Sequence, residues 1–178
     1  MKKILSIVFL AALFVLPLIP SAAACDKRAT ITYEEWPNGI VEVGEEVQWL
    51  VEIVVGNAFA PGSAPGVVFT DVVVTDNLGA ELEIDSPFPL WGDGSVSFTT
   101  IGVSDKVKLT WLVPDMAYGQ FYSLAFYVST DINPAGHQEY TSPGVKFLNS
   151  GPTMKYWING VQYSLKLNTI MITVYPKV

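Results

Sequence analysis

Residues 46–55, EVQWLVEIVV, decide the fold class of this 178-residue chain. Successive side chains of an extended strand point to opposite faces of the sheet. One face of such a strand would carry only apolar side chains, namely Val47, Trp49, Val51, Ile53 and Val55. The opposite face would carry the polar Gln48 and Glu52. This alternation predicts a half-buried β-strand.

Short runs of the same kind fill the chain beyond residue 29, with Gly, Pro, Asn and Asp between them. No ten-residue stretch there has a helical period. The expected strands lie within residues 67–76, 95–103, 106–113, 120–131, 155–165 and 168–178. Asn159-Gly160 separates two alternating runs and predicts a hairpin, because both residues tolerate positive φ. The pattern predicts an all-β domain, an antiparallel sandwich or barrel of about eight to ten strands.

Two segments refine this expectation. GVVFTDVVVTD, residues 66–76, is apolar on both faces until Asp76, which predicts a strand that is covered on both sides and ends there. Residues 56–66 contain three Gly and two Pro and are expected to form a long loop. The large aromatic residues on strands are expected in the core: Trp49, Trp111, Phe121, Phe126 and Trp157.

The start of the chain has the three parts of a secretory signal peptide. Lys2 and Lys3 precede an apolar run at residues 4–20, and small residues follow it up to Ala24. Prolines interrupt the run, so cleavage is favoured over a permanent membrane span. We expect a signal peptide at residues 1–24 and a single domain at residues 25–178 that works outside the cell or at its surface.

Cys25 is the only cysteine in the chain. The preceding AAA resembles a lipoprotein processing site, although Ala22 stands where a large apolar residue is usual. Two interpretations follow: Cys25 is the acylated first residue, or it is a free thiol after an ordinary cut. In both, no disulfide forms within the chain, and any membrane attachment is through a lipid on Cys25.

Three stretches together resemble a known family: residues 41–84, residues 109–136 and FLNSG at residues 147–151. They resemble the conserved-repeat domain of bacterial and archaeal surface proteins, also called domain of unknown function eleven. The matching features are Val43-Gly44, the strand to Asn57, the run from Val72 to Asp76, Gly119 ahead of the strand Phe121 to Val128, and Asn149. The loop at residues 58–66 is longer than in the family, and the tail after Gly151 is additional. The resemblance implies an immunoglobulin-like sandwich at the cell surface, present in one copy, and no reaction.

The sequence predicts no enzyme. His137, the only histidine, lies in a Gly/Pro loop, and Cys25 has no base near it in sequence. Calcium is the one metal ion considered, and its candidate ligands are Asp76, Glu81, Glu83, Asp85 and Asp93. Their spacing is not that of an EF-hand, and acids on an edge strand also block unwanted pairing. The formal net charge of −7 argues against a nucleic-acid partner.

A covalent cross-link between strands is a further hypothesis. Lys146 or Lys155 would join Asn149 or Asn168, provided that a buried acid lies between them.

The main functional hypothesis is a structural or adhesive surface protein, in which copies join into a filament such as a pilus. In KRATITYEE, residues 27–35, the side chains of Ala29, Ile31 and Tyr33 alternate with polar ones. This segment is either the first strand of its own sandwich or a strand donated to the open sheet of a neighbour.

The alternative is a binding module for polysaccharide or another surface protein. Its contact surface would be the loops at residues 58–66 and 86–94, with Phe88 and Trp91 exposed. Against this, Trp91 would fold back as a plug over the end of the sandwich. A pilin-like protein that keeps its apolar N-terminus ranks third, because no cleavage site follows Lys3.

Overall fold

The computed structural model describes residues 29–36, 40–58, 60–85, 89–101, 106–130 and 140–178. These residues contain strands, turns and bends but no helix. The first large sheet consists of β1 (Ala29–Trp36), β3 (Gln48–Gly56), β10 (Phe121–Ser129) and β5 (Glu83–Ile84) in that order, with β6 (Trp91–Gly92) also paired to β10. The second consists of β13 (Val161–Lys166), β12 (Asn149–Ile158), β4 (Val68–Leu78), β8 (Lys106–Val113) and β7 (Ser95–Ile101), with β9 (Met116–Ala117) paired to β4.

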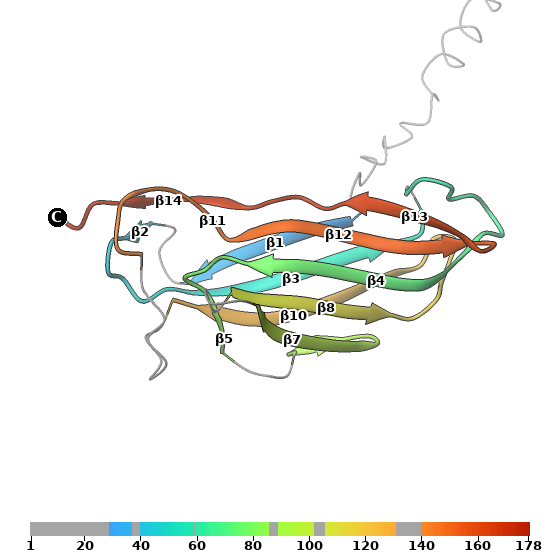
Figure 1. Ribbon diagram of the computed structural model, residues 1–178, viewed down its shortest axis with the longest axis horizontal. Helices are drawn as coiled ribbons and strands as arrows, with labels where there is room; N and C mark the ends of the chain where they lie inside the picture. Colours follow the sequence, from blue (N-terminus) through green and yellow to red (C-terminus); the bar gives the residue numbers. More distant parts are fainter. Residues whose placement is uncertain (1–28, 37–39, 59, 86–88, 102–105, 131–139) are drawn as a thin grey trace, which may run out of the picture.

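A small third sheet lies at one end of the molecule (Figure 1). It contains β11 (Gly144–Phe147), β14 (Met171–Tyr175) and β2 (Val41–Glu42). The C-terminus lies at this end, and β1 begins at the opposite end (Figure 1). The β14–β2 pair is parallel, and the other strand pairs of the described residues are antiparallel.

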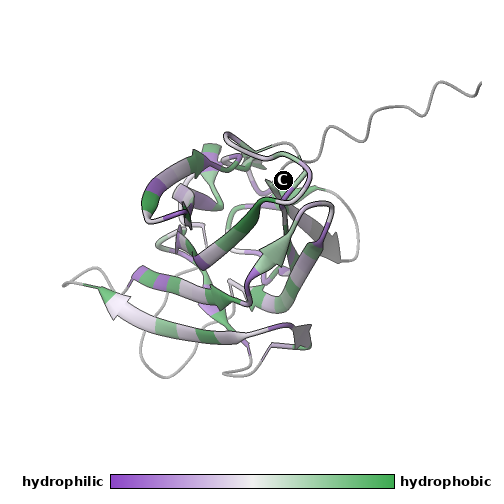
Figure 2. Ribbon diagram, turned by 90° about the vertical axis from the view of Figure 1, so that its right-hand side faces the viewer, coloured by the Kyte–Doolittle hydropathy of each residue, from purple (hydrophilic) through white to green (hydrophobic). Residues whose placement is uncertain are grey.

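One hydrophobic core joins the two large sheets. Trp49 and Phe126 enter it from the first sheet, and Trp111 and Tyr156 enter it from the second. The ring of Phe126 meets that of Phe98 on β7 edge to face, with centroids 5.3 Å apart. Viewed along the long axis, polar and apolar residues alternate along the strands (Figure 2). The predicted antiparallel β-sandwich is therefore confirmed.

Strand β3 matches its prediction closely. The five apolar residues of its predicted inner face are all buried, and Gln48 is exposed. The predicted hairpin is confirmed as well, since Asn159 and Gly160 join β12 to β13 with φ angles of 50° and 79°. Two successive positive φ values are the mark of the type I′ turn that suits twisted strands.

Strand β4 corrects the expectation of a strand covered on both sides. Thr70 pairs with Trp157 and Val73 pairs with Lys155, so β4 holds one extra residue, a β-bulge. Asp71 has a φ of 50° within this bulge. The extra residue shifts the alternation by one position.

The shift explains why both faces looked apolar. Phe69 points inward before the bulge, and Val72 and Val74 point inward after it. Val73 is only half-buried on the other face. The strand does lie between two neighbours, β12 and β8, but it continues through Asp76 to Leu78. The prediction that Asp76 ends the strand is wrong, because Asp76 is directed into the core and is 2% exposed.

Phe121 is the other correction among the expected core residues. Trp49, Trp111 and Phe126 are buried and Trp157 is half-buried, whereas Phe121 is 47% exposed. The ring of Phe121 lies over Gly56, where an added Cβ would come within 2.2 Å of it. Phe121 therefore covers the backbone of β3 from outside, on the face away from the core.

Candidate functional site

The N-terminal segment forms strand β1 of its own sandwich. Its register runs from Ala29 opposite Val55 to Trp36 opposite Gln48, antiparallel to β3. Ile31 is fully buried, and Ala29 and Tyr33 pack against the core half-buried. The three residues that alternate with polar ones in the sequence therefore share the face that packs against the core. Strand β1 is at the edge of its sheet, since β3 is its only strand neighbour among the described elements.

A side chain occupies the outer edge of β1. The backbone N–H of Ile31 donates to Oδ1 of Asn168 at 2.6 Å, and Nδ2 of Asn168 donates to the carbonyl oxygen of Ile31 at 2.7 Å. A primary amide has the donor and the acceptor of a peptide group. Asn168 thus makes the two bonds that one residue of an adjacent antiparallel strand would make.

Asn149 holds Asn168 in place. Nδ2 of Asn149 donates to the carbonyl oxygen of Asn168 at 3.3 Å, and Oδ1 of Asn149 accepts from the backbone N–H of Ile170 at 2.7 Å. The same Nδ2 donates to Oδ2 of Asp76 at 2.9 Å. Asn149 is fully buried. A continuous polar network therefore runs from β4 through β12 and the β13–β14 linker to the edge of β1.

Asp76 is the ionisable end of this network. Burial raises the pKa of Asp76 from 3.8 to about 7, although hydrogen bonds from Asn149 and from the backbone of Asn77 act to lower it. Its Oδ1 is buried and has no hydrogen-bond partner among the described residues. The free-energy cost of burying the charged carboxylate away from water exceeds the stabilisation that these hydrogen bonds give to it. At neutral pH the Asp76 carboxyl is therefore poised between its two protonation states.

Tyr33 connects β1 directly to the surroundings of Asp76. Its Oη donates to the carbonyl oxygen of Leu148 at 3.3 Å. Burial raises the pKa of the Tyr33 phenol well above 10, and the negative charges of Asp76 and Tyr140 raise it further. The Asp76 carboxyl is therefore close enough to Tyr33 for its charge to raise the pKa of the phenol.

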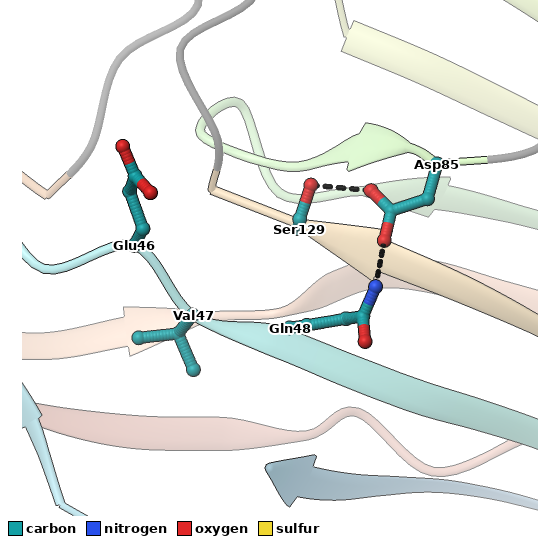
Figure 3. A pocket seen from close by; sticks show the side chains of 5 residues that line it. All are labelled: Glu46, Val47, Gln48, Asp85 and Ser129. Carbon is teal, nitrogen blue, oxygen red and sulfur yellow. Dashed lines mark hydrogen bonds between the residues drawn. The ribbon is translucent and has the colours of Figure 1, made fainter. Parts of the chain in front are cut away.

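A polar hollow of about 400 Å³ opens beside the end of β10 (Figure 3). It is lined by Glu46, Val47, Gln48, Asp85 and Ser129. The Asp85 carboxylate accepts hydrogen bonds from Nε2 of Gln48 at 2.5 Å and from Oγ of Ser129 (Figure 3). These bonds join β3 and β10 to the segment after β5 and have a structural role.

The acids considered for calcium do not come together. Asp76 lies in the core and Asp85 lies in the hollow beside Ser129. Within the part of the chain that the structure describes, no three His, Cys, Asp or Glu residues form a group that would hold a metal ion. The calcium hypothesis gains no site from this arrangement.

Trp91 does not plug the end of the sandwich. It pairs with Ala125 as part of β6, and 48% of its surface is exposed. Leu90 beside it is 46% exposed. Phe121 lies on the same outer face as Ala125, because it is four residues from it on β10. The outer face of the first sheet thus presents two large aromatic side chains, of which the sequence pattern suggested only Trp91.

Neither lysine considered for the cross-link is hydrogen-bonded to Asn149 or Asn168 in the described part of the chain. Asn149 does have a buried acid beside it, Asp76. However, Nζ of Lys146 donates to Oγ of Ser142 at 3.0 Å. Lys155 is exposed between the buried Met154 and Tyr156, so it points away from the core. Asn168 is bonded to Ile31 and not to a lysine.

Several predicted residues lie outside the described residues. They are Cys25, Phe88, His137 and the expected leader at residues 1–24. Among the described residues, no helix is long and apolar enough to cross a membrane.

No family model and no curated protein matches the chain. A cohesin module of a family 33 glycoside hydrolase from Clostridium perfringens is similar in structure, with 12% identity, a TM-score of 0.44 and coverage of 84% of this chain and 98% of that one. A non-cellulosomal cohesin from the archaeon Archaeoglobus fulgidus has 18% identity, a TM-score of 0.42 and coverage of 85% and 92%. The major pilin subunit of Bacillus cereus has 16% identity and a TM-score of 0.44, and 83% of this chain covers 40% of it. Similarity at this level identifies no family, so the resemblance to the conserved-repeat domain stays a prediction.

Proposed function

We propose that this protein is a non-enzymatic structural or adhesive subunit of the cell surface, and that its copies associate by exchange of strand β1. The leader-like start of the sequence supports export. Cys25 lies four residues before Ala29, so a lipid on Cys25 would tether the molecule at the end where β1 begins. The small sheet and the C-terminus would then point away from the membrane.

The observation that carries this proposal is the position of β1. It is an edge strand that contributes the fully buried Ile31, and among the described residues its backbone is bonded to β3 on the inner edge and to the side chain of Asn168 at Ile31. An exchanged strand would make the same contacts in a neighbouring copy, so exchange has little cost in contact energy. If each copy gives its strand to the next and the series does not close, a filament results.

The test is a protein that lacks residues 25–36, combined with a synthetic peptide of residues 27–36. We expect the shortened protein to stay monomeric and to bind the peptide, with the peptide restoring any lost stability. A control peptide with Ile31→Asp should not bind, because a charge would enter the core. Filaments formed by the shortened protein without peptide would contradict the proposal.

A second candidate function rests on the exposed aromatic residues of the first sheet. Trp91 and Phe121 are 48% and 47% exposed on its outer side. Exposed aromatic side chains are common anchors in binding surfaces. Binding of purified envelope polysaccharide should fall at least tenfold in Trp91→Ala if this face is the contact surface. The control is Ile101→Ala, which alters an exposed apolar residue on β7. Equal binding by the parent protein and Trp91→Ala would remove this candidate.

A further inference from the structure

The outer edge of β1 is held by a network whose far end is ionisable. We propose that Asp76, Asn149 and Asn168 form a proton-controlled latch, which keeps β1 in its own sheet when Asp76 is protonated and loosens it when Asp76 is ionised. The latch is the regulation of the strand exchange described above and rests on that proposed function. Its partner is a second copy of this chain.

The latch holds β1 at the edge that faces away from β3. In the non-hydrogen-bonded pair of Ile31 with Ile53, both backbone groups of Ile31 point away from β3. The Asn168 side chain bonds both of these groups and so covers the outer edge of β1 at this one residue. These two bonds must break before β1 can leave its own sheet, and an exchanged β1 would make them again with Asn168 of the copy that receives it.

The coupling to Asp76 passes through two routes. Asn149 bonds both the Asp76 carboxyl and the backbone of Asn168, so a shift of the carboxyl is transmitted to the linker that carries the latch. Tyr33 of β1 lies near Asp76 and bonds Leu148, the neighbour of Asn149. When β1 leaves, Tyr33 leaves with it, and water gains access to the carboxyl.

Asp76 is the ionisable residue among the three of the latch, and its pKa is raised to about 7 by burial. The ionisable groups near it are Tyr33 and, beside Tyr33, Tyr140, which in turn lies near Glu81. Burial raises the pKa of both phenols above 10, so they stay neutral in this range. The Asp76 carboxyl has its ordinary pKa of 3.8 when hydrated and about 7 when buried. Opening therefore releases a proton.

The direction follows from this difference. Well below pH 4 the carboxyl is protonated in both states, and the latch has its full strength. Between pH 4 and pH 7 the open state is favoured increasingly, by about tenfold per pH unit, because one proton is released on opening. Well above pH 7 the carboxyl is ionised in both states, and the opening constant no longer changes with pH.

Hydrogen exchange of the Ile31 amide, followed by NMR on the purified protein, tests the latch. After correction for the intrinsic exchange rate, we expect the opening constant of Ile31 to rise about fiftyfold from pH 5 to pH 7 and to level off above pH 8. The Val74 amide in the middle of the second sheet is the reference, and it should open far less often than Ile31 at each pH. Asp76→Asn should flatten the profile and Thr169→Ala should leave it unchanged, whereas Asn168→Ala, which removes the acceptor of the Ile31 amide, should abolish its protection at every pH.

The latch is contradicted if Ile31 and Val74 open with the same constant, or if the Ile31 profile is flat in the parent protein. The readout at Ile31 requires no assembly, so the two proposals fail separately. If Ile31 opens as expected but copies never exchange strands, the proposed function fails and the latch stands. If copies exchange strands equally fast at pH 5 and pH 8, the latch fails and the proposed function stands.

Discussion

Asp76 places a carboxyl group in the core, where burial raises its pKa to about 7. The sequence pattern indicated this residue as a strand end, since Asp is rare inside strands. It did not indicate that Asn149, far along the chain, would donate to the carboxyl, nor that Asn168 would bond Ile31. Such pairings join residues more than 70 positions apart and depend on the packing of two sheets, which periodicity alone does not contain.

Replacement of Asp76 by Asn should change how stability depends on pH. A carboxyl with a raised pKa contributes most below pH 4, and its contribution is lost as pH rises to about 7. The loss corresponds to at most about 4 kcal/mol. We expect the free energy of unfolding of Asp76→Asn to exceed that of the parent increasingly between pH 4 and pH 7. Urea denaturation at a series of pH values measures this, and parallel curves for the two proteins would contradict it.

Asn57 should be as important to stability as a large core residue. Its buried Nδ2 donates to the carbonyl oxygens of Val67 and Met116 at 3.0 and 2.8 Å. Asn57→Ala should lower the free energy of unfolding by about 2–4 kcal/mol, because two carbonyls lose their donor. Asn57→Asp should be at least as harmful, since a carboxylate cannot donate. A loss below 1 kcal/mol in thermal melts of Asn57→Ala would show that water replaces the side chain.

At the scale of elements, strands with a regular period were predictable and β4 was not. The alternation in β3 and the Asn159-Gly160 turn depend only on neighbouring residues, so the sequence contains them in full. The bulge at Asp71 shifts the inward face by one residue, and an uninterrupted period of two therefore assigns the wrong face beyond it. Asp is tolerated at a positive φ but does not require one, so Asp71 did not indicate a bulge in the sequence.

The β12–β13 hairpin permits a test of its turn. Gly160 has a φ of 79°, and an added Cβ would meet no atom within 4 Å. Gly160→Ala should therefore lower stability by about 1 kcal/mol through backbone strain alone. Gly66→Ala is the matched control outside a hairpin, because Gly66 has a φ of 85° and equally open surroundings. Chemical denaturation that finds Gly160→Ala as stable as the parent would contradict the type I′ assignment.

At the scale of the whole molecule, the all-β sandwich could be predicted because strand-like runs and turn residues recur along the chain. The edge position of β1 could not, because the order of strands in a sheet is set by contacts between distant segments. The same applies to the exposure of Phe121, which follows from its place on the outer face of β10. The proposed assembly and its latch depend on two of these features, the edge position of β1 and the Asn168 side chain that bonds it at Ile31.

Exchange of β1 between copies is tested most directly by cross-linking two different single variants. Thr32 and Glu52 lie directly opposite each other in the β1–β3 pair and point outward. Thr32→Cys and Glu52→Cys, each in a Cys25→Ser background, are mixed under assembly conditions and treated with a short bismaleimide. A link between unlike chains can form only if β1 of one copy pairs with β3 of another. Thr32→Cys mixed with Gln162→Cys, on β13 of the second sheet, is the control for random contact.

We predict that assembled material yields covalent heterodimers from the Thr32→Cys and Glu52→Cys mixture, and none from the control mixture. Assemblies that form fully but yield no link between unlike chains would contradict the central claim that the copies are joined by β1.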